Sequence, residues 1–120
     1  MMNSVLTKQL FDGTSIAASG TLTSDNIMLT GPVGYFSLQI TETGDGTGKW
    51  EYEVSNDGIN FLTPTGSSDI VTAFTKTSGP GGDGKDIYQI SPGIFAWLRI
   101  KVTETGTANA ITPVATIAVQ

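Results

Sequence analysis

The sequence predicts an all-β protein, a two-sheet antiparallel β-sandwich of jelly-roll-like form with about eight short strands. Three observations predict it: apolar and polar residues alternate along several stretches, glycine-rich turns separate them, and helical periodicity of useful length is missing. The chain has 120 residues, of which 15 are glycine and only 14% are charged, a composition typical of short strands joined by many turns. We expect one sandwich domain over residues 1–120.

The stretch from Gly34 to Pro64 contains the clearest pair of strands. Apolar residues of one parity occur at Phe36, Leu38 and Ile40, and again at Trp50, Tyr52 and Val54. Such alternation gives each strand one apolar face and one polar face. The link at residues 44–48, GDGTG, tolerates positive φ and predicts a hairpin, and the Asp57-Gly58 pair predicts a second turn. We therefore expect a β-meander here.

The other strands follow from the same alternation. They are expected at residues 4–10, 15–23, 26–30, 70–76, 86–90, 96–103 and 112–119. The last of the clear alternations places Leu98, Ile100 and Val102 with the six apolar residues above in a shared core. Residues 78–84, SGPGGDG, are expected to form a loop. The N-terminal segment 3–10 and the closing strand 112–120 carry few charges and are expected at sheet edges open to pairing.

One internal similarity relates two halves of the chain. Residues 35–44, YFSLQITETG, align with residues 97–106, WLRIKVTETG, in parity and in their shared TETG ending. Each copy is followed by a glycine-containing turn and another strand. Two such hairpins fit opposing sheets of a sandwich or neighbouring positions in one sheet.

Composition and charge exclude several classes of function. The net charge is −5 and the pI is about 4.3, and the six basic residues form no stripe that would bind nucleic acid. The chain has neither histidine nor cysteine, which excludes Ser-His-Asp and Cys-His catalysis and the usual zinc sites. It shows neither a membrane-length apolar stretch nor a secretory signal, so we expect synthesis in the host cytoplasm. We expect no cofactor.

Carboxylates and a glycine-rich loop supply the remaining candidates for chemistry. Glu51 and Glu53 lie two positions apart on one strand face, about 6.5–7 Å by strand rise, a separation at the lower limit for an inverting glycosidase pair. We interpret them instead as part of a solvated face with Lys49, paired with Arg99 and Lys101. Residues 81–89, GGDGKDIYQ, match the calcium β-roll nonapeptide, but that architecture needs stacked copies to complete a site. No catalytic or metal residue is assigned.

Trp97 is the most informative single residue. It falls on the polar parity of its strand beside Arg99 and Lys101, and Tyr35 holds the equivalent position in the similar segment. Outward aromatics near charged residues indicate a partner interface or a platform for sugar stacking, whereas the plainer interpretation is that a loop of the same chain covers Trp97. These four residues are the interface candidates.

The runs GYFSLQITETGDGTGKWEYEVSNDGINFLTP and AWLRIKVTETGTANAITPVATIAVQ resemble small β-rich proteins encoded among bacteriophage and prophage structural genes. Those proteins share a GxFSLQ run, a YxxSxDGxNF/W turn and an RIKVTETG run that ends in a short apolar strand. The resemblance covers residues 34–64 and 96–120. It implies a virion component, such as a head decoration, cement or tail-associated protein, that is oligomeric and not an enzyme.

Two function hypotheses from different classes follow. The first is a phage structural protein, located in the virion, whose partners are other copies of itself and capsid or tail proteins. The second is a carbohydrate-binding or adhesion module in which Trp97 and Tyr35 stack on a glycan.

Overall fold

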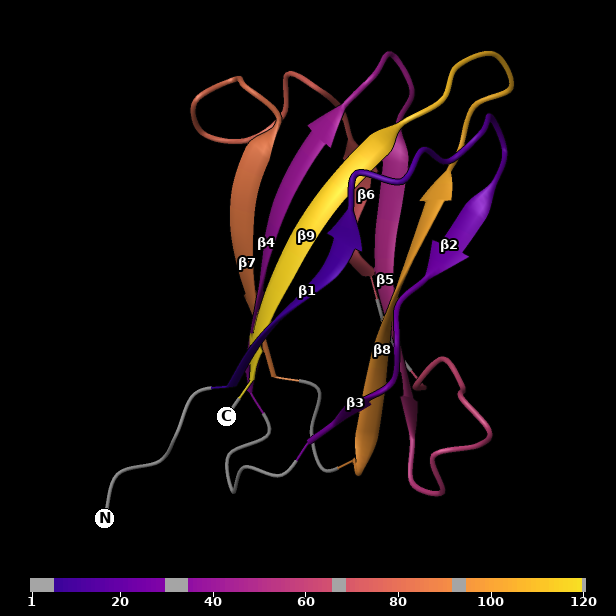
Figure 1. The fold of residues 1–120 in the computed structure, drawn as a ribbon, viewed down its shortest axis with the longest axis vertical. Helices are drawn as coiled ribbons and strands as arrows, with labels where there is room; N and C mark the ends of the chain where they lie inside the picture. Colours follow the sequence, from indigo (N-terminus) through magenta and orange to yellow (C-terminus); the bar gives the residue numbers. More distant parts are fainter. Residues whose placement is uncertain (1–5, 30–34, 66–68, 92–94, 120) are drawn as a thin grey trace.

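The computed structural model describes residues 6–29, 35–65, 69–91 and 95–119. These residues form nine β-strands and no helix, so they contain no helical segment that could cross a membrane (Figure 1). The strands are β1 Leu6–Asp12, β2 Thr21–Thr23, β3 Ile27–Met28, β4 Phe36–Thr43, β5 Gly48–Ser55, β6 Asp69–Phe74, β7 Lys85–Ile90, β8 Trp97–Glu104 and β9 Thr112–Val119. The predicted all-β fold is confirmed.

The strands form two antiparallel sheets that pack face to face (Figure 1). One has the order β1-β9-β4-β7 and the other β2-β8-β5-β6, with β3 also paired to β8. Successive strands pass repeatedly from one sheet to the other, and this order is that of an eight-stranded jelly roll to which β3 is added. The jelly-roll-like sandwich expected from the alternation is therefore confirmed.

The predicted hairpin between residues 36–41 and 49–55 is wrong in its pairing. β4 pairs with β9 and β7, whereas β5 pairs with β8 and β6, so the glycine link crosses the end of the sandwich instead of joining neighbours. Gly44 does adopt a positive φ of 95°, and a Cβ there would lie 2.6 Å from the Ala110 carbonyl oxygen. The glycine link is a tight turn, as the sequence predicts, but it forms an arch between the two sheets.

The predicted core is confirmed. All nine residues assigned to it are buried, and Leu38, Ile40, Trp50, Leu98, Ile100 and Val102 have no exposed surface. Two edge-to-face aromatic pairs connect the sheets, Phe11 with Trp50 and Phe36 with Tyr52, each with ring centroids 5.7 Å apart. Period-two alternation on both sheets thus places one apolar layer between them.

Two strand predictions need correction. The strand expected over residues 15–23 is reduced to Thr21–Thr23, because residues 17–20 form a turn in which Ser19 has a φ of 62°. Ile16 makes only an isolated bridge with Ile111. The strand expected over residues 26–30 is described as Ile27–Met28, and residue 30 lies outside the described part.

The prediction for the sheet edges is half right. β1 is an edge strand, as expected, but β9 lies between β1 and β4 and is not an edge. The lack of charge along β9 fits an inner strand and not an open edge, because natural edge strands often carry charges that prevent unwanted pairing. The other edges are formed by β7, β6 and the short strands β2 and β3.

The internal similarity has a structural counterpart. β4 and β8, the strands of the two similar segments, occupy corresponding inner positions in opposite sheets, as one of the two alternatives expected. Each continues through a glycine-containing turn into a strand of the other sheet, β5 or β9. The shared TETG ending places Glu42 and Glu104 at the same point of the two strands, and both side chains are 1% exposed.

Candidate contact surface

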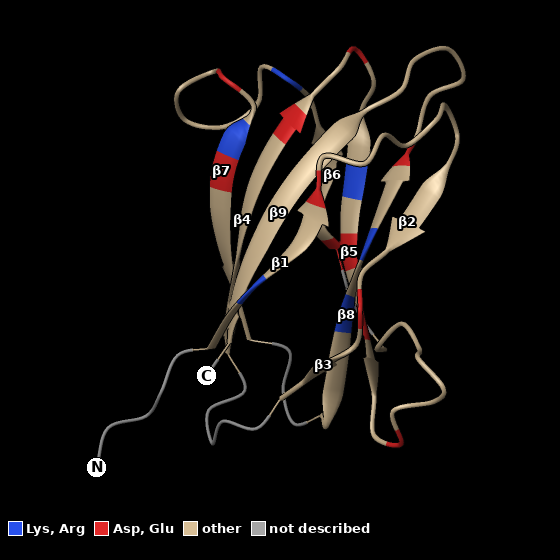
Figure 2. Cartoon of the chain, viewed as in Figure 1, with Lys and Arg blue, Asp and Glu red and all other residues tan. Residues whose placement is uncertain are grey.

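The outer face of the β1-β9-β4-β7 sheet has no ionisable side chain over its central area. The cross-strand register places on this face Thr7, Gln9, Ser37, Gln39, Thr41, Ile87, Gln89, Val114, Thr116 and Ala118, which we call the neutral face. Asp12 and Lys85 lie on the same side but near one end of the two edge strands. Figure 2 shows β9 without a charged residue along its length. In a chain of net charge −5, such a face is suited to contact with another protein, because interface centres are depleted of charge.

The outer face of the other sheet is charged, and four of its five charged residues in β5 and β8 take part in ion pairs. Glu53 lies opposite Arg99 and Glu51 opposite Lys101 on the neighbouring strands β5 and β8. Arg99 Nε donates to Glu53 Oε1 at 2.7 Å, and the Arg99 guanidinium lies 4.6 Å from the centre of the Phe61 ring. Lys49 completes the group, with its Nζ 3.7 Å from Asp69 Oδ1 and 4.0 Å from Glu51 Oε2. We call these five residues of β5 and β8 the charged face.

The four predicted interface candidates do not lie on one face. Trp97, Arg99 and Lys101 lie on the outer side of β8, whereas Tyr35 precedes β4 in the opposite sheet and is 44% exposed. The ring of Trp97 is half-buried because the turn at Gly58 lies against it, such that a Cβ at Gly58 would be 2.9 Å from Trp97 Nε1. A loop of the same chain therefore covers part of the indole. The role of these residues as interface candidates stays a prediction.

Glu51 and Glu53 are both half-buried within the ion pairs just described. Glu53 pairs with Arg99 as predicted, whereas Glu51 approaches Lys49. Lys101 lies opposite Glu51 in register, but no ion pair joins the two within the described part of the chain. An inverting glycosidase needs one protonated carboxyl group and one ionised carboxylate on either side of a substrate cleft. Here both carboxylates lie on one face of a sheet and not on either side of a cleft.

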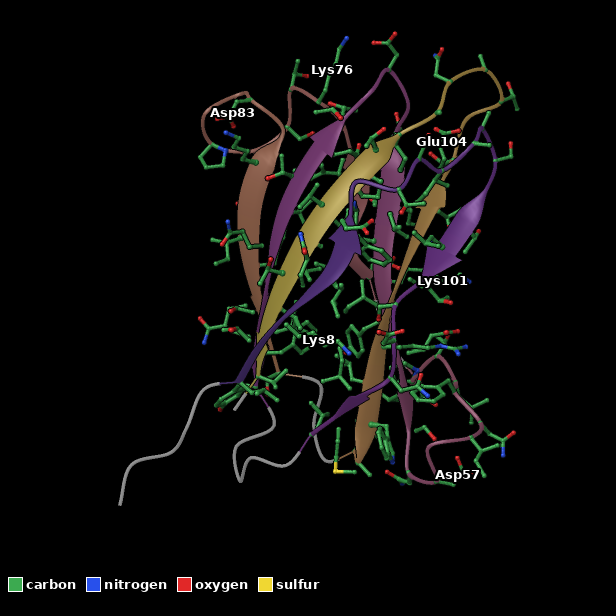
Figure 3. The ribbon with its side chains drawn as sticks, in the orientation of Figure 1. Lys8, Asp57, Lys76, Asp83, Lys101 and Glu104 are labelled. Atoms are coloured by element: carbon green, nitrogen blue, oxygen red, sulfur yellow. The ribbon has the colours of Figure 1, made fainter. Side chains whose placement is uncertain are left out.

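The glycine-rich segment of the calcium nonapeptide forms the loop before β7, as predicted. One of its two carboxylates, Asp86, accepts the backbone N–H of Ile87 at 2.8 Å. The other, Asp83, lies in the exposed loop, where Figure 3 labels it. Among the described residues, no group of three or more acidic side chains is close enough to hold a metal ion.

The turn after β5 is built around one carboxylate. Asp57 accepts the backbone N–H groups of Ile59 and Asn60 at 2.9 and 2.8 Å and the Ser55 hydroxyl at 2.8 Å, and these donors lower its pKa well below the usual range. The turn predicted at Asp57-Gly58 is thereby confirmed, and the backbone hydrogen bonds between Val54 and Leu62 close it as a short hairpin. An open groove of about 660 Å³ lies beside this turn, lined by residues that include Asn56, Thr63 and Phe95.

The sequence reasoning missed a pair of buried carboxyl groups. Glu104 lies at the end of the sandwich where β4 passes to β5, as Figure 3 shows. It accepts the backbone N–H groups of Ser19, Thr47 and Gly106 at 2.9–3.2 Å, and the donors at Thr47 and Gly106 contribute most to lowering its pKa. One carboxylate thus connects three loops.

Glu42 has the opposite environment. Burial raises the pKa of this carboxyl group to about 7, the Trp50 Nε1–H donor at 3.2 Å opposes the rise, and the charge of Glu104 adds to it. Its second oxygen, Oε2, is buried without a hydrogen-bond partner among the described residues. The signal was present in the sequence, because Glu42 and Glu104 have the inward parity of their strands. The shared TETG ending instead served only as evidence of the internal similarity.

Solved structures similar to this chain include proteins of viruses, phages and prophages. The chain aligns with infectious bursal virus derived T=1 particles with a TM-score of 0.61 at 6% identity, covering 98% of this chain and 32% of that one. It aligns with the PBSX exported protein XepA with a TM-score of 0.60 at 11% identity, covering 95% and 36%. A third similar structure is the enzymatically active domain of bacteriophage CBA120 tailspike protein 4, with a TM-score of 0.53 at 15% identity, covering 96% and 18%.

These similarities establish the fold and agree with the resemblance to phage-encoded β proteins. The chain spans about a third of the length of the first two structures and less of the third. No protein-family model and no curated protein matches the sequence.

Proposed function

We propose that this chain is a structural subunit of a bacteriophage particle, a head-decoration, cement or tail-associated protein that acts by contact and not by catalysis. The observation that carries the proposal is the neutral face. A protein of net charge −5 leaves one whole side of a sheet without ionisable groups at its centre, while it covers the opposite side with mostly paired charges. A free surface gains solubility from charge, so a face without charge is best explained by contact with a partner.

The architecture supports the same proposal. Jelly rolls serve viral capsids and lectins, and the similar structures include viral particles and prophage proteins. The partners that fit are other copies of this chain and the proteins of a capsid or tail lattice. The site of action would then be the virion.

The experiment that tests the proposal measures whether the chain sediments with phage particles purified from cultures that produce it. We expect association that survives an increase from 0.1 to 1 M NaCl, because exposed ion pairs are screened at high salt whereas a contact between uncharged surfaces is not. Release of the chain at high salt would assign the contact to the charged face instead. Absence of the chain from the particles would contradict the structural role.

Sugar binding is the second candidate function, and the groove beside the Asp57 turn favours it. Its lining includes amide and hydroxyl side chains and the ring of Phe95, which are the groups that hydrogen-bond to a sugar and stack on it. Glycan-array binding that is lost on Trp97→Ala, next to the Gly58 turn, would support this function. Unchanged glycan binding in that variant would show that Trp97 takes no part in sugar binding.

A further inference from the structure

The glycine link between β4 and β5 packs directly on the two buried carboxyl side chains. Residues 44–47, which we call the arch, belong to neither strand and lie at the end of the sandwich where Figure 3 labels Glu104. A Cβ at Gly46 would lie 3.0 Å from Glu104 Cγ. A Cβ at the adjoining Gly48 would collide with Glu42 Oε1. Only glycine allows the backbone to approach both groups so closely.

The arch is held less firmly than the strands that it joins. The Gly46 N–H donates to the Ala110 carbonyl at 3.2 Å, and the Thr47 N–H donates to Glu104 Oε2 at 2.9 Å. The Thr47 carbonyl accepts the Thr105 N–H at 2.9 Å. β4 and β5, in contrast, each pair along eight residues with β9 or β8. Displacement of the arch therefore breaks few bonds and can occur while the sheets stay intact.

Glu42 is enclosed beside the arch with one oxygen unpartnered. Its side chain is 1% exposed, and its Oε1 accepts the Trp50 Nε1–H at 3.2 Å. Its Oε2 is buried without a hydrogen-bond partner among the described residues. A protonated carboxyl group tolerates this site far better than a carboxylate, for which a buried oxygen without a donor is costly. Ionisation of Glu42 thus requires water at Oε2.

The charges around Glu42 make its ionisation less favourable still. The charged residues on the arch and on the strands packed around Glu42 are Asp45, Lys49, Glu51, Glu53, Lys85, Asp86, Arg99, Lys101 and Glu104. Of these, Glu104 is the one whose charge acts on the pKa of Glu42, and it raises that pKa. Loss of the Glu42 proton therefore places two negative charges side by side under the arch.

We propose that the arch is a proton-controlled lid, which lies closed over Glu42 while this carboxyl group is protonated and opens to admit water when the proton passes to solvent. Opening breaks the Thr47 bond to Glu104 and leaves the sandwich folded. The inference goes beyond the proposed function and does not depend on it.

The pH range of the opening follows from the two environments of Glu42. Its pKa is about 7 under the closed arch, and we expect the ordinary value of 4.5 when water reaches the group. The ratio of open to closed molecules should therefore rise about tenfold per pH unit between these two values and stay constant above them. The total rise is about 300-fold.

Hydrogen exchange of the arch amides tests the lid. The protection factors of the Gly46 and Thr47 amides should fall by up to about 300-fold between pH 4.5 and 7. They should be insensitive to urea below the unfolding transition, because a local opening exposes little surface. In Glu42→Gln, which cannot ionise, protection should not change with pH. Protection that stays constant with pH in the wild type, or that urea lowers as strongly as it lowers that of the core residue Leu38, would overturn the inference.

The indole of Trp50 provides a second measurement that needs no variant. The chain contains two tryptophans, and only Trp50 donates to Glu42. Its indole N–H resonance should shift with a midpoint at or below pH 7, while that of Trp97 stays unchanged. A Trp50 resonance that does not titrate would contradict the lid. Both measurements use the isolated chain, so their results are independent of sedimentation with particles.

Discussion

Glu42 should make the stability of this protein depend on pH in a direction unusual for a carboxyl group. Burial raises its pKa in the folded state from the ordinary value of 4.5 to about 7. Below pH 4.5 the group is protonated in both the folded and unfolded chain. Between pH 4.5 and 7 Glu42 is ionised in the unfolded chain before it is ionised in the folded one. The contribution of the protonated Glu42 to stability is therefore lost progressively over this range and is gone above pH 7. The difference between the folded-state and unfolded-state pKa of Glu42 corresponds to roughly 3 kcal/mol of unfolding free energy.

The variant Glu42→Gln tests this reasoning. Glutamine keeps an oxygen that can accept the Trp50 Nε1–H bond but has no charge to bury. Urea unfolding at a series of pH values should show wild-type stability falling by up to about 3 kcal/mol between pH 4.5 and 7.5, with most of this slope removed in the variant. An equal slope in both proteins would refute the account of Glu42. Glu104→Gln is the comparison, because the pKa of Glu104 is lowered and its contribution is lost below pH 4.5.

Three further outcomes are expected. Leu98→Ala removes a fully buried side chain from between the sheets and should lower the unfolding free energy by about 2–5 kcal/mol, measured by urea unfolding; a loss below about 1 kcal/mol would mean that the core is wrongly placed. Gly79→Ala should lower the melting temperature more than Gly82→Ala, because both glycines have positive φ but only the first packs directly against the Lys85 carbonyl; equal melting temperatures would contradict this packing. Millimolar calcium should leave the melting temperature unchanged, since one copy of the nonapeptide at residues 81–89 does not complete a site; a rise that chelator reverses would show that it does.

The sequence predicted the features that depend on local alternation and missed those that depend on which strands pair with one another. Parity alone places Leu38, Trp50 and Leu98 in the core, because a strand between two sheets must bury one face. The same alternation cannot say which strand lies next to which. The GDGTG link satisfies the backbone of a hairpin and of an arch equally well, and only the distant pairing of β4 with β9 decides between them.

The candidate contact surface could likewise not be predicted from local patterns. The neutral face combines four strands that are far apart in the chain, and its lack of charge becomes visible only when β9 is placed between β1 and β4. Trp97 was conspicuous in the sequence because of its outward parity. Its partial cover by Gly58 arises from a turn that begins after the neighbouring strand. Glu42 could have been found, because inward parity next to Ile40 predicts a buried carboxyl group.

The central claim is that the neutral face binds a phage particle, and two threonines test it most directly. Thr116→Glu introduces a charge at the centre of the neutral face, and Thr103→Glu makes the same change at a half-buried position on the outer side of the other sheet. The measurement is the number of copies of each variant that sediment with purified particles, after equal melting temperatures have shown that both variants are folded. We predict that Thr116→Glu abolishes association while Thr103→Glu retains it. Sedimentation of the Thr116→Glu variant with the particles, or loss of association in the Thr103→Glu variant alone, would contradict the claim.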